Sequence, residues 1–339
     1  MSEGKEAMLW ERLNDDVRCM LCNHHCTIPP GKTGICAVRK NVDGALRTLI
    51  YGMTSSIAVD PIEKKPLFHF CPGTDVLSLG TVGCNFRCLH CQNYTISMAR
   101  VGDIPLYSIS PDYVVEQAKR TGCRGVAWTY NEPTIWFEFT YDSSKIAKDN
   151  GLYSVYVTNG YMSEEALQEI APYLDAMNID VKAFNDEFYR KICGGAHLEP
   201  VLDTCVMAKS MGIHIELTYL IIPDYNDTER EIRNFARWVV ETLGPDIPCH
   251  FTRFYPHYKM LDLPPTPMKR LNMAYNLAKE EGINYVYLGN IPHNEKENTY
   301  CHNCGKLLIE RWGFNVVKYV IKDGKCPYCG SVIPGVFNH

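Results

Sequence analysis

An alternation of two kinds of segment constrains the fold of this chain more than any other feature. Between residues 75 and 290, short runs rich in Val, Ile and Tyr alternate with segments of helical period, a pattern typical of βα units around a parallel sheet. Six or seven such units are fewer than a closed barrel needs, so the pattern predicts an α/β fold with an open, partial (β/α)6-type TIM barrel. We expect strands near 76–81, 125–130, 153–158, 176–181, 214–221, 249–254 and 284–288, and helices near 111–121, 134–149, 163–171, 200–211, 227–243 and 267–281.

The two ends of the chain follow other patterns. Residues 1–74 hold four cysteines and then a loop-like stretch, 60–66, whereas the tail from residue 299 holds two cysteine pairs around a strand-like run, 315–321. We therefore predict an N-terminal cysteine-rich extension (1–74), a barrel (75–298) and a metal-binding tail of the zinc-ribbon or rubredoxin kind (299–339).

Charge and hydropathy narrow the partners and the location. The chain has 34 Lys and Arg against 39 Asp and Glu, a net charge of -5, so it lacks the basic excess that binds nucleic acid. Its first residues are charged and no apolar segment follows them, which argues against a secretory signal. The longest apolar run, 217–223, is too short to cross a bilayer. We expect a soluble, cytoplasmic protein with neither a nucleic-acid nor a membrane partner.

The 16 cysteines are concentrated in three groups. Because cytosolic thiols stay reduced and structural disulfides are rare there, metal binding is the expected role of each group. The groups are Cys19, Cys22, Cys26 and Cys36; Cys84, Cys88 and Cys91; and Cys301, Cys304, Cys326 and Cys329.

The central group follows directly on the first predicted strand, at the end of a barrel strand where chemistry takes place. Its run is Gly83-Cys84-Asn85-Phe86-Arg87-Cys88-Leu89-His90-Cys91. Three thiolates in eight residues can hold one corner of a 4Fe-4S cluster and leave the fourth iron open. An open iron can chelate the amino and carboxylate groups of S-adenosylmethionine (SAM).

The spacing C-x3-C-x2-C, with His90 before the last cysteine, resembles the signature of the radical SAM superfamily. The resemblance implies that an electron from the cluster cleaves SAM to a 5'-deoxyadenosyl radical, and that Phe86 and His90 lie at the cofactors. The alternatives are a zinc knuckle or unligated core cysteines. A zinc site, however, usually takes four ligands from paired C-x2-C turns.

Polar residues end the next three predicted strands. The resemblance assigns Asn131 and Glu132, after the second strand, to the SAM amino group, and Asn159, Asp180 and Lys182, after the third and fourth, to its ribose and carboxylate. Each residue considered alone is equally explained as a turn cap or a surface ion pair. Residues 220–223 end the fifth strand. They either pack against the adenine of SAM or simply form a core strand and its turn.

The two flanking cysteine groups differ in how clearly their spacing predicts one kind of metal centre. Cys301-x2-Cys304 and Cys326-x2-Cys329, each followed by Gly, match a structural zinc ribbon, with iron as the alternative. Cys19-x2-Cys22-x3-Cys26-x9-Cys36 fits either zinc or a second iron-sulfur cluster, since soft thiolates suit both.

Across nearly its whole length the chain resembles the pyruvate formate-lyase activating enzymes and, more closely, the AmmeMemoRadiSam-system radical SAM proteins. The motifs that carry this are Tyr51-Gly52, the stretch from Asp60 to Phe70, the run from Cys91 to Asn93, Tyr156 to Tyr161, His250 to Pro256, Tyr285 to Asn290 and the C-terminal pairs. Activating enzymes with extra clusters carry more cysteines just after the central motif, whereas residues 92–122 hold none. This departure puts glycyl-radical activation in doubt.

The leading hypothesis is a radical SAM enzyme that modifies a carbon of a protein or peptide residue, because the resembled group largely acts on proteins. A low-potential donor of the ferredoxin or flavodoxin type would supply the electron. The alternatives are a cobalamin-dependent C-methyltransferase acting on a protein such as methyl-coenzyme M reductase, an activase of a glycyl radical enzyme, and a zinc-ribbon adaptor without activity. The usual cobalamin motif D-x-H-x-x-G is missing from the sequence.

Two further sets of residues remain open. His250, Arg253, Tyr255 and Tyr258 near the sixth strand's end either line the substrate mouth or pack with a polar tip exposed. Cys71 is expected to be a small core residue rather than a reactive thiol.

Overall fold

The computed structural model describes residues 4–337, and an eight-stranded sheet forms its centre. Seven strands run parallel and pair in the order in which they follow along the chain. The sheet ends at β16 on one side and β8 on the other, so the barrel is open, and the predicted α/β class is confirmed. The parallel strands are β9 (Asp75–Gly80), β11 (Gly125–Trp128), β12 (Tyr153–Thr158), β13 (Ala176–Asp180), β14 (His214–Ile221), β15 (Cys249–Arg253) and β16 (Val286–Gly289).

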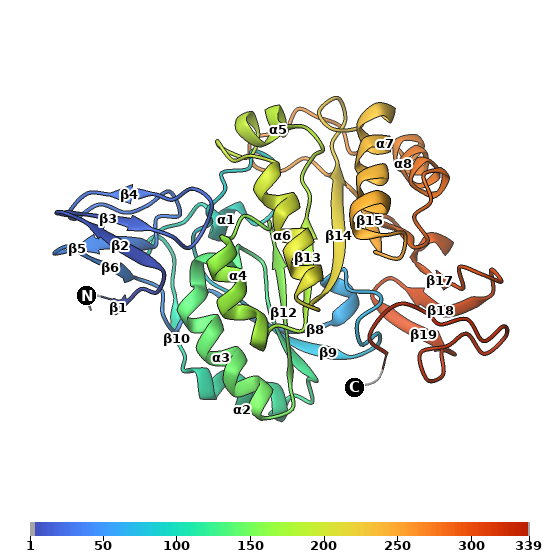
Figure 1. Ribbon diagram of the computed structural model, residues 1–339, viewed down its shortest axis with the longest axis horizontal. Coiled ribbons are helices and arrows are strands. Elements are labelled where there is room, and N and C mark those ends of the chain that lie inside the picture. The colour runs from blue at the N-terminus through green and yellow to red at the C-terminus, as the bar shows by residue number, and fades with distance from the viewer. Residues whose placement is uncertain (1–3, 338–339) are drawn as a thin grey trace.

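Six helices connect these strands and cover the outside of the sheet (Figure 1). All six match predicted helices. Three of them begin at side-chain caps: Ser110 accepts a hydrogen bond from Tyr113 N, Ser163 accepts one from Ala166 N, and Thr228 accepts one from Glu231 N. The helices are α2 (Pro111–Arg120), α3 (Phe137–Asp149), α4 (Glu164–Ile170), α6 (Glu199–Ser210), α7 (Glu229–Trp238) and α8 (Met268–Glu280), and two short ones are α1 (Tyr94–Ser97) and α5 (Asp186–Lys191).

Residues 60–66, which were expected to form a loop, instead include the end of a strand and a 3-10 turn. Strand β8 (Ser56–Pro61) pairs antiparallel with β9, and a 3-10 turn follows at Ile62–Lys64. Pro61 is tolerated because β8 is an edge strand, where a missing N–H breaks no ladder. Residues before position 74 thus contribute a strand to the barrel sheet, and the division of the chain at 74 stays a prediction.

A polar network fills the amino-terminal half of the barrel interior. The buried carboxylate of Glu216 on β14 accepts hydrogen bonds from the backbone N–H of His69 and from the ring of His250, each at 2.7 Å. Asn178 on β13 donates to the carbonyl of Pro66 at 2.7 Å. The segment 65–70 therefore fills the amino-terminal end of the barrel interior. His250 lies in this buried network and not at a mouth.

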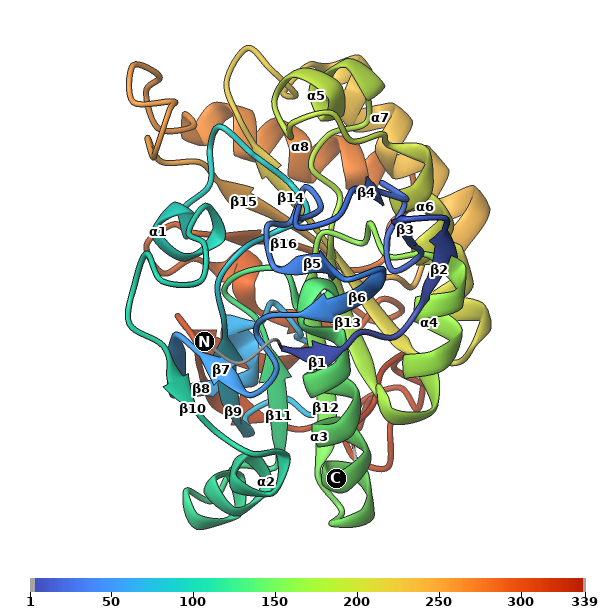
Figure 2. The ribbon, with the colours of Figure 1, turned by 90° about the vertical axis from the view of Figure 1, so that its left-hand side faces the viewer.

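The chain ends cover opposite ends of the barrel (Figure 1). At the carboxyl end lie small antiparallel sheets of the N-terminal extension, seen in front of the barrel strands in Figure 2. Hydrogen bonds from Asn23 N to Tyr161 O and from Ser163 N to Leu21 O, both 3.1 Å, join them to the turn after β12. Their strands are β1 (Lys5–Glu6), β2 (Trp10–Leu13), β3 (Asp16–Cys19), β4 (Thr27–Ile28), β5 (Arg39–Val42), β6 (Ala45–Thr48) and β7 (Met53–Thr54), and β7 pairs with β10 (Tyr107–Ser108) from the barrel region.

The C-terminal ribbon, residues 299–337, covers the amino end. It consists of β17 (Thr299–Tyr300), β18 (Leu307–Trp312) and β19 (Asn315–Tyr319) in one antiparallel sheet. Its apolar residues pack on Phe68, Tyr285 and Tyr287. No helix within residues 4–337 is long and apolar enough to span a membrane.

Candidate functional site

The central cysteines lie on a loop, residues 81–93, that leaves the carboxyl end of β9; we call it the cysteine loop. Asn131, from the end of β11, fixes its start, because its side chain accepts a hydrogen bond from Thr81 N at 3.0 Å and donates one to Gly83 O at 2.9 Å. Gly83 has φ +87°, and a Cβ at this position would stand 2.7 Å from the carbonyl of Cys36. A close approach of two cysteine-bearing loops therefore requires glycine here.

The three thiols of this loop have different surroundings. Cys84 Sγ accepts a hydrogen bond from Phe86 N at 3.3 Å, Cys88 is buried beside Cys193, and Cys91 lies beside Ser97. Burial, and then the carboxylate of Glu132, raises the pKa of the Cys84 thiol well above its usual range. A bound metal centre would supply the positive charge that such a thiolate needs.

Glu132 and Asn159 form a buried brace behind Cys84. One carboxylate oxygen of Glu132 accepts hydrogen bonds from the backbone and side chain of Thr134 and from Thr158, and the other accepts from Asn159 N at 2.8 Å. Asn159 Nδ2 donates to Asn85 Oδ1 at 2.7 Å and lies 3.9 Å from Cys84 Sγ. These side chains hold the cysteine loop in place, and their direct contact with SAM stays a prediction.

Asp180 and Lys182, at the end of β13, form an ion pair beside the same loop. Although burial opposes it, the charge of Asp180 raises the pKa of Lys182 above its usual value. Burial, and then the charge of Lys182, lowers the pKa of His90 to about 3. His90 is therefore neutral at physiological pH, and its Nδ1 has no partner among the described residues.

From the sequence, Cys193 was not expected beside the cysteine loop. Its carbonyl accepts a hydrogen bond from Arg87 N at 2.8 Å, and Ile192 O accepts one from Leu89 N at 3.0 Å, so this segment runs along the cysteine loop. At Gly194, with φ +88°, a Cβ would stand 2.6 Å from the Cβ of Arg87. Gly194 is therefore the one feature of the sequence that could have indicated this contact.

Phe86 supports the loop from the other side. It is 1% exposed, and its ring meets that of Tyr161 edge to face with a centroid distance of 5.2 Å. Together the residues around the loop fit a 4Fe-4S cluster held by three thiolates. A cluster uses a different iron for each thiolate, so the sulfurs need not converge on one point. The buried Nδ1 of His90, which has no partner among the described residues, is a polar group on the same loop that could contact the cluster or SAM.

The C-terminal cysteines converge on a single point. Cys301 and Cys329 have sulfurs 3.6 Å apart, those of Cys304 and Cys326 are 3.7 Å apart, and all four lie within 4.8 Å of one another. This spacing suits one tetrahedral metal ion. Hydrogen bonds from Ser331 lower the pKa of Cys329 to about 6, which favours the thiolate form that binds metal.

The N-terminal cysteines also come together. Cys19, Cys22, Cys26 and Cys36 all line one small pocket, which we call the N-terminal cysteine pocket. His24 turns toward the cysteine loop and bonds Asn85 O at 2.8 Å. The sequence left open whether zinc or a second cluster binds here.

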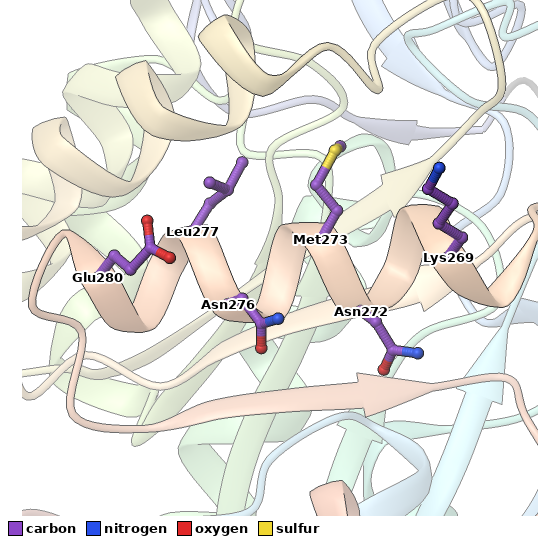
Figure 3. Close-up of a pocket in the computed structure, with 6 residues that line it drawn as sticks. All are labelled: Lys269, Asn272, Met273, Asn276, Leu277 and Glu280. Atoms are coloured by element: carbon purple, nitrogen blue, oxygen red, sulfur yellow. The ribbon is translucent and has the colours of Figure 1, made fainter.

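One surface feature lies apart from all three cysteine groups. An open hollow of about 670 Å³ follows α8, with Met273 and Leu277 on one side and Asn272 and Asn276 on the other (Figure 3). It lies outside the barrel and holds no group of candidate metal ligands, so we assign it no part in the site.

Comparison with known proteins decides the family. The sequence model of the radical SAM superfamily matches residues 78–239, which include the cysteine loop and the ends of β11 to β14. The protein MJ0808 of Methanocaldococcus jannaschii is 50% identical over 332 residues, which cover 97% of this chain and 98% of that protein. This chain belongs to the radical SAM superfamily. The superfamily assignment implies a 4Fe-4S cluster and SAM as cofactors, and the chain is an enzyme.

More distant radical SAM proteins share parts of this chain. A pyruvate formate-lyase-activating enzyme of Clostridium pasteurianum is 26% identical over 157 residues, 45% of this chain and 65% of that one. The crystal structure of Streptococcus suis SuiB bound to S-adenosylmethionine matches 71% of this chain and 56% of its own, with a TM-score of 0.50 and 12% identity. The latter similarity shows the fold alone.

Proposed function

We propose that this radical SAM enzyme modifies a carbon atom of a protein or peptide substrate. When bound, the cluster and SAM supply a 5'-deoxyadenosyl radical that abstracts hydrogen from an unactivated carbon. The residues of the chain position this chemistry, exclude water and admit the substrate. The observation that carries the proposal is an exposed apolar rim beside the cysteine loop.

The rim consists of Tyr94, Tyr258 and Leu261. Tyr94 begins α1, directly after the cysteine loop, and its ring stacks on that of Tyr258 at a centroid distance of 4.9 Å. Leu261, in the loop that follows β15, is 66% exposed and Tyr94 is 38% exposed, whereas Tyr258 is half-buried. Exposed apolar groups gathered at one place are typical of surfaces that bind another chain.

The loop after β15 is attached to the cysteine loop. Lys259 N donates a hydrogen bond to Leu89 O at 3.0 Å, which fixes the rim relative to the three cysteines. Arg253 closes the base of this loop by donating to Thr266 O at 2.9 Å, and Tyr255 donates to Asn290 O at 3.1 Å. Of the residues considered for a substrate mouth, Tyr258 therefore lies on the rim, whereas Arg253 and Tyr255 support it.

A relative supports a protein substrate. The Clostridium pasteurianum protein is by its name an activating enzyme of another enzyme, pyruvate formate-lyase. In the present chain the sheet does not close between β16 and β8, and we propose that a polypeptide segment approaches the carboxyl ends of the strands from this side. We also infer zinc in the C-terminal ribbon, a ferredoxin- or flavodoxin-type donor, and a cytoplasmic location.

The test is a mass measurement on candidate partner proteins after anaerobic incubation with the reconstituted enzyme, SAM and reductant. The proposal predicts a mass change at one residue and loss of that change in Leu261→Asp. Val317→Asp, at a similarly exposed site on β19, is the matched control and should modify the partner normally. Added methyl groups together with bound corrinoid would favour C-methylation, and a stable glycyl radical on the partner would favour an activase. A partner set that never changes mass contradicts the proposal.

A further inference from the structure

The N-terminal cysteine pocket has the features of a second metal centre. Cys19 ends β3, and its N–H donates to the carbonyl of Cys26 at 3.0 Å, so the β3–β4 turn brings Cys22 and Cys26 to the same place. Cys36 comes from the loop before β5 and completes the lining. Cys19, Cys22 and Cys36 are buried and Cys26 is half-buried, so the site is shielded yet lies near the surface.

The spacing of the sulfurs differs between the two flanking cysteine sets. A tetrahedral zinc ion places its sulfurs about 3.8 Å apart, as follows from Zn–S bonds of about 2.3 Å. The C-terminal four match this with 3.6 and 3.7 Å. Within residues 4–337 they are the one group whose candidate ligand atoms all lie within 4.8 Å of each other. The four N-terminal thiols line one pocket but do not form such a group.

Two residues that line the pocket carry a buried N–H group with no acceptor among the described residues. These groups are Nε of Arg39 and Nδ2 of Asn85, and both residues are 1% exposed. An unsatisfied buried donor costs about 1–3 kcal/mol, and more when it is charged. Thiolate and sulfide sulfurs of an anionic iron-sulfur cluster would accept from both, as such outer contacts commonly do.

We propose that Cys19, Cys22, Cys26 and Cys36 bind a second 4Fe-4S cluster, and that Asn85 stands between it and the cluster of the cysteine loop. Asn85 is one of the residues that line the N-terminal cysteine pocket, and its Oδ1 lies 3.8 Å from Cys84 Sγ. The backbone of Cys36 packs on Gly83, and Arg87 donates to the carbonyl of Ile35. The two cysteine loops are thus in direct contact.

The number of ligands defines the role of this second cluster. Four thiolates coordinate all four irons, so no iron is open to bind a substrate. The cluster instead relays electrons. A reduced protein of the ferredoxin or flavodoxin class gives up one electron to it and is oxidised. The same electron then passes to the cluster at Cys84, Cys88 and Cys91. Ile35, 44% exposed, marks the side from which a donor reaches the pocket.

The first test counts metals in a chain that cannot hold the first cluster. Full-length protein with Cys84→Ala, Cys88→Ala and Cys91→Ala is reconstituted anaerobically and assayed for iron, labile sulfide and zinc. We expect about four irons and four sulfides per chain, with the paramagnetic signal of a reduced 4Fe-4S cluster after dithionite. Adding Cys22→Ala and Cys26→Ala should remove this iron. Retained zinc in the C-terminal ribbon and an unchanged circular dichroism spectrum control for folding.

The proposal is overturned if the triple variant binds no sulfide, whether it takes up a second zinc ion or no further metal. The relay is tested separately in Cys22→Ala with Cys26→Ala, in which the cysteine loop is intact. Dithionite should still reduce its remaining cluster, whereas reduction by flavodoxin should lose its fast phase. Unchanged reduction by flavodoxin would refute the relay. Neither result depends on which substrate the enzyme modifies.

Discussion

Arg39 and Glu138 form an ion pair at 2.9 Å in which both side chains are almost completely buried. It joins the N-terminal extension, through β5, to α3 of the barrel. Glu138 also accepts a hydrogen bond from Met8 N at 2.8 Å, and Arg39 donates to Met8 O. One carboxylate thus sets the position of the extension and of the N-terminal cysteine pocket that Arg39 lines.

Glu138→Ala should lower the free energy of unfolding by about 3–5 kcal/mol, because it leaves the buried Arg39 guanidinium without its counter-charge. Chemical denaturation measures the change. Lys191→Ala, which removes an exposed ion pair with Glu187, should leave the free energy of unfolding nearly unchanged in the same measurement. Equal effects of the two substitutions would show that the Arg39 pair contributes no more than a surface pair does.

Glu132→Gln distinguishes a brace from a SAM ligand. An amide offers one accepting atom in place of two, so it loses the hydrogen bond from Asn159 N or those from Thr134 and Thr158. We expect a loss of about 1–3 kcal/mol in stability and a lower yield of 5'-deoxyadenosine at unchanged SAM affinity. Thr158→Val, which removes one of these donors, should have a smaller effect. Weaker SAM binding at unchanged stability would instead support direct contact with SAM.

Features that depend on local sequence could be predicted, whereas those that depend on contacts between distant parts of the chain could not. The barrel strands and helices were predictable because their apolar periods are local. Asn159 and Asp180 were assigned to the site by resemblance, and they lie near the cysteines because the carboxyl ends of parallel strands share an edge. The position of His250 could not be predicted. A polar residue that faces into the barrel has the same sequence pattern whether it lies in a buried hydrogen-bond network or at the substrate mouth. Nor could the position of Cys193 be predicted, because its contact with the cysteine loop depends on tertiary packing.

His69 makes stability depend on pH. It is buried, and burial, opposed in part by Glu216, lowers its pKa to about 4. Because the unfolded chain has a histidine pKa near 6.5, it binds the proton first as the pH falls from 6.5 toward 4, and the folded state loses stability. Between pH 7.5 and 5 the loss should be about 2 kcal/mol by urea denaturation. His69→Gln should flatten this dependence, whereas exposed His197→Gln should not; an unchanged slope in His69→Gln would contradict the assignment.

Removing the metal from the C-terminal ribbon should destabilise the barrel without affecting iron. The ribbon packs on Tyr285 and Tyr287 at the barrel's amino end, and His302 bonds the hydroxyl of Tyr285 at 2.8 Å. Cys304→Ser with Cys329→Ser should therefore lose one zinc per chain and melt at a lower temperature, with the iron content unchanged. Tyr328→Ala, an exposed change on the same turn, is the control. Iron lost together with zinc would mean that the two sites are not independent.

The measurement that tests the central claim most directly is the formation of 5'-deoxyadenosine from SAM by the anaerobically reconstituted enzyme with dithionite. The full chain should release it and methionine in equal amounts. The variant with Cys84→Ala, Cys88→Ala and Cys91→Ala should release none, even though its C-terminal ribbon should still bind metal. Cleavage of SAM by that variant, or none by the reconstituted wild-type enzyme, would contradict the account.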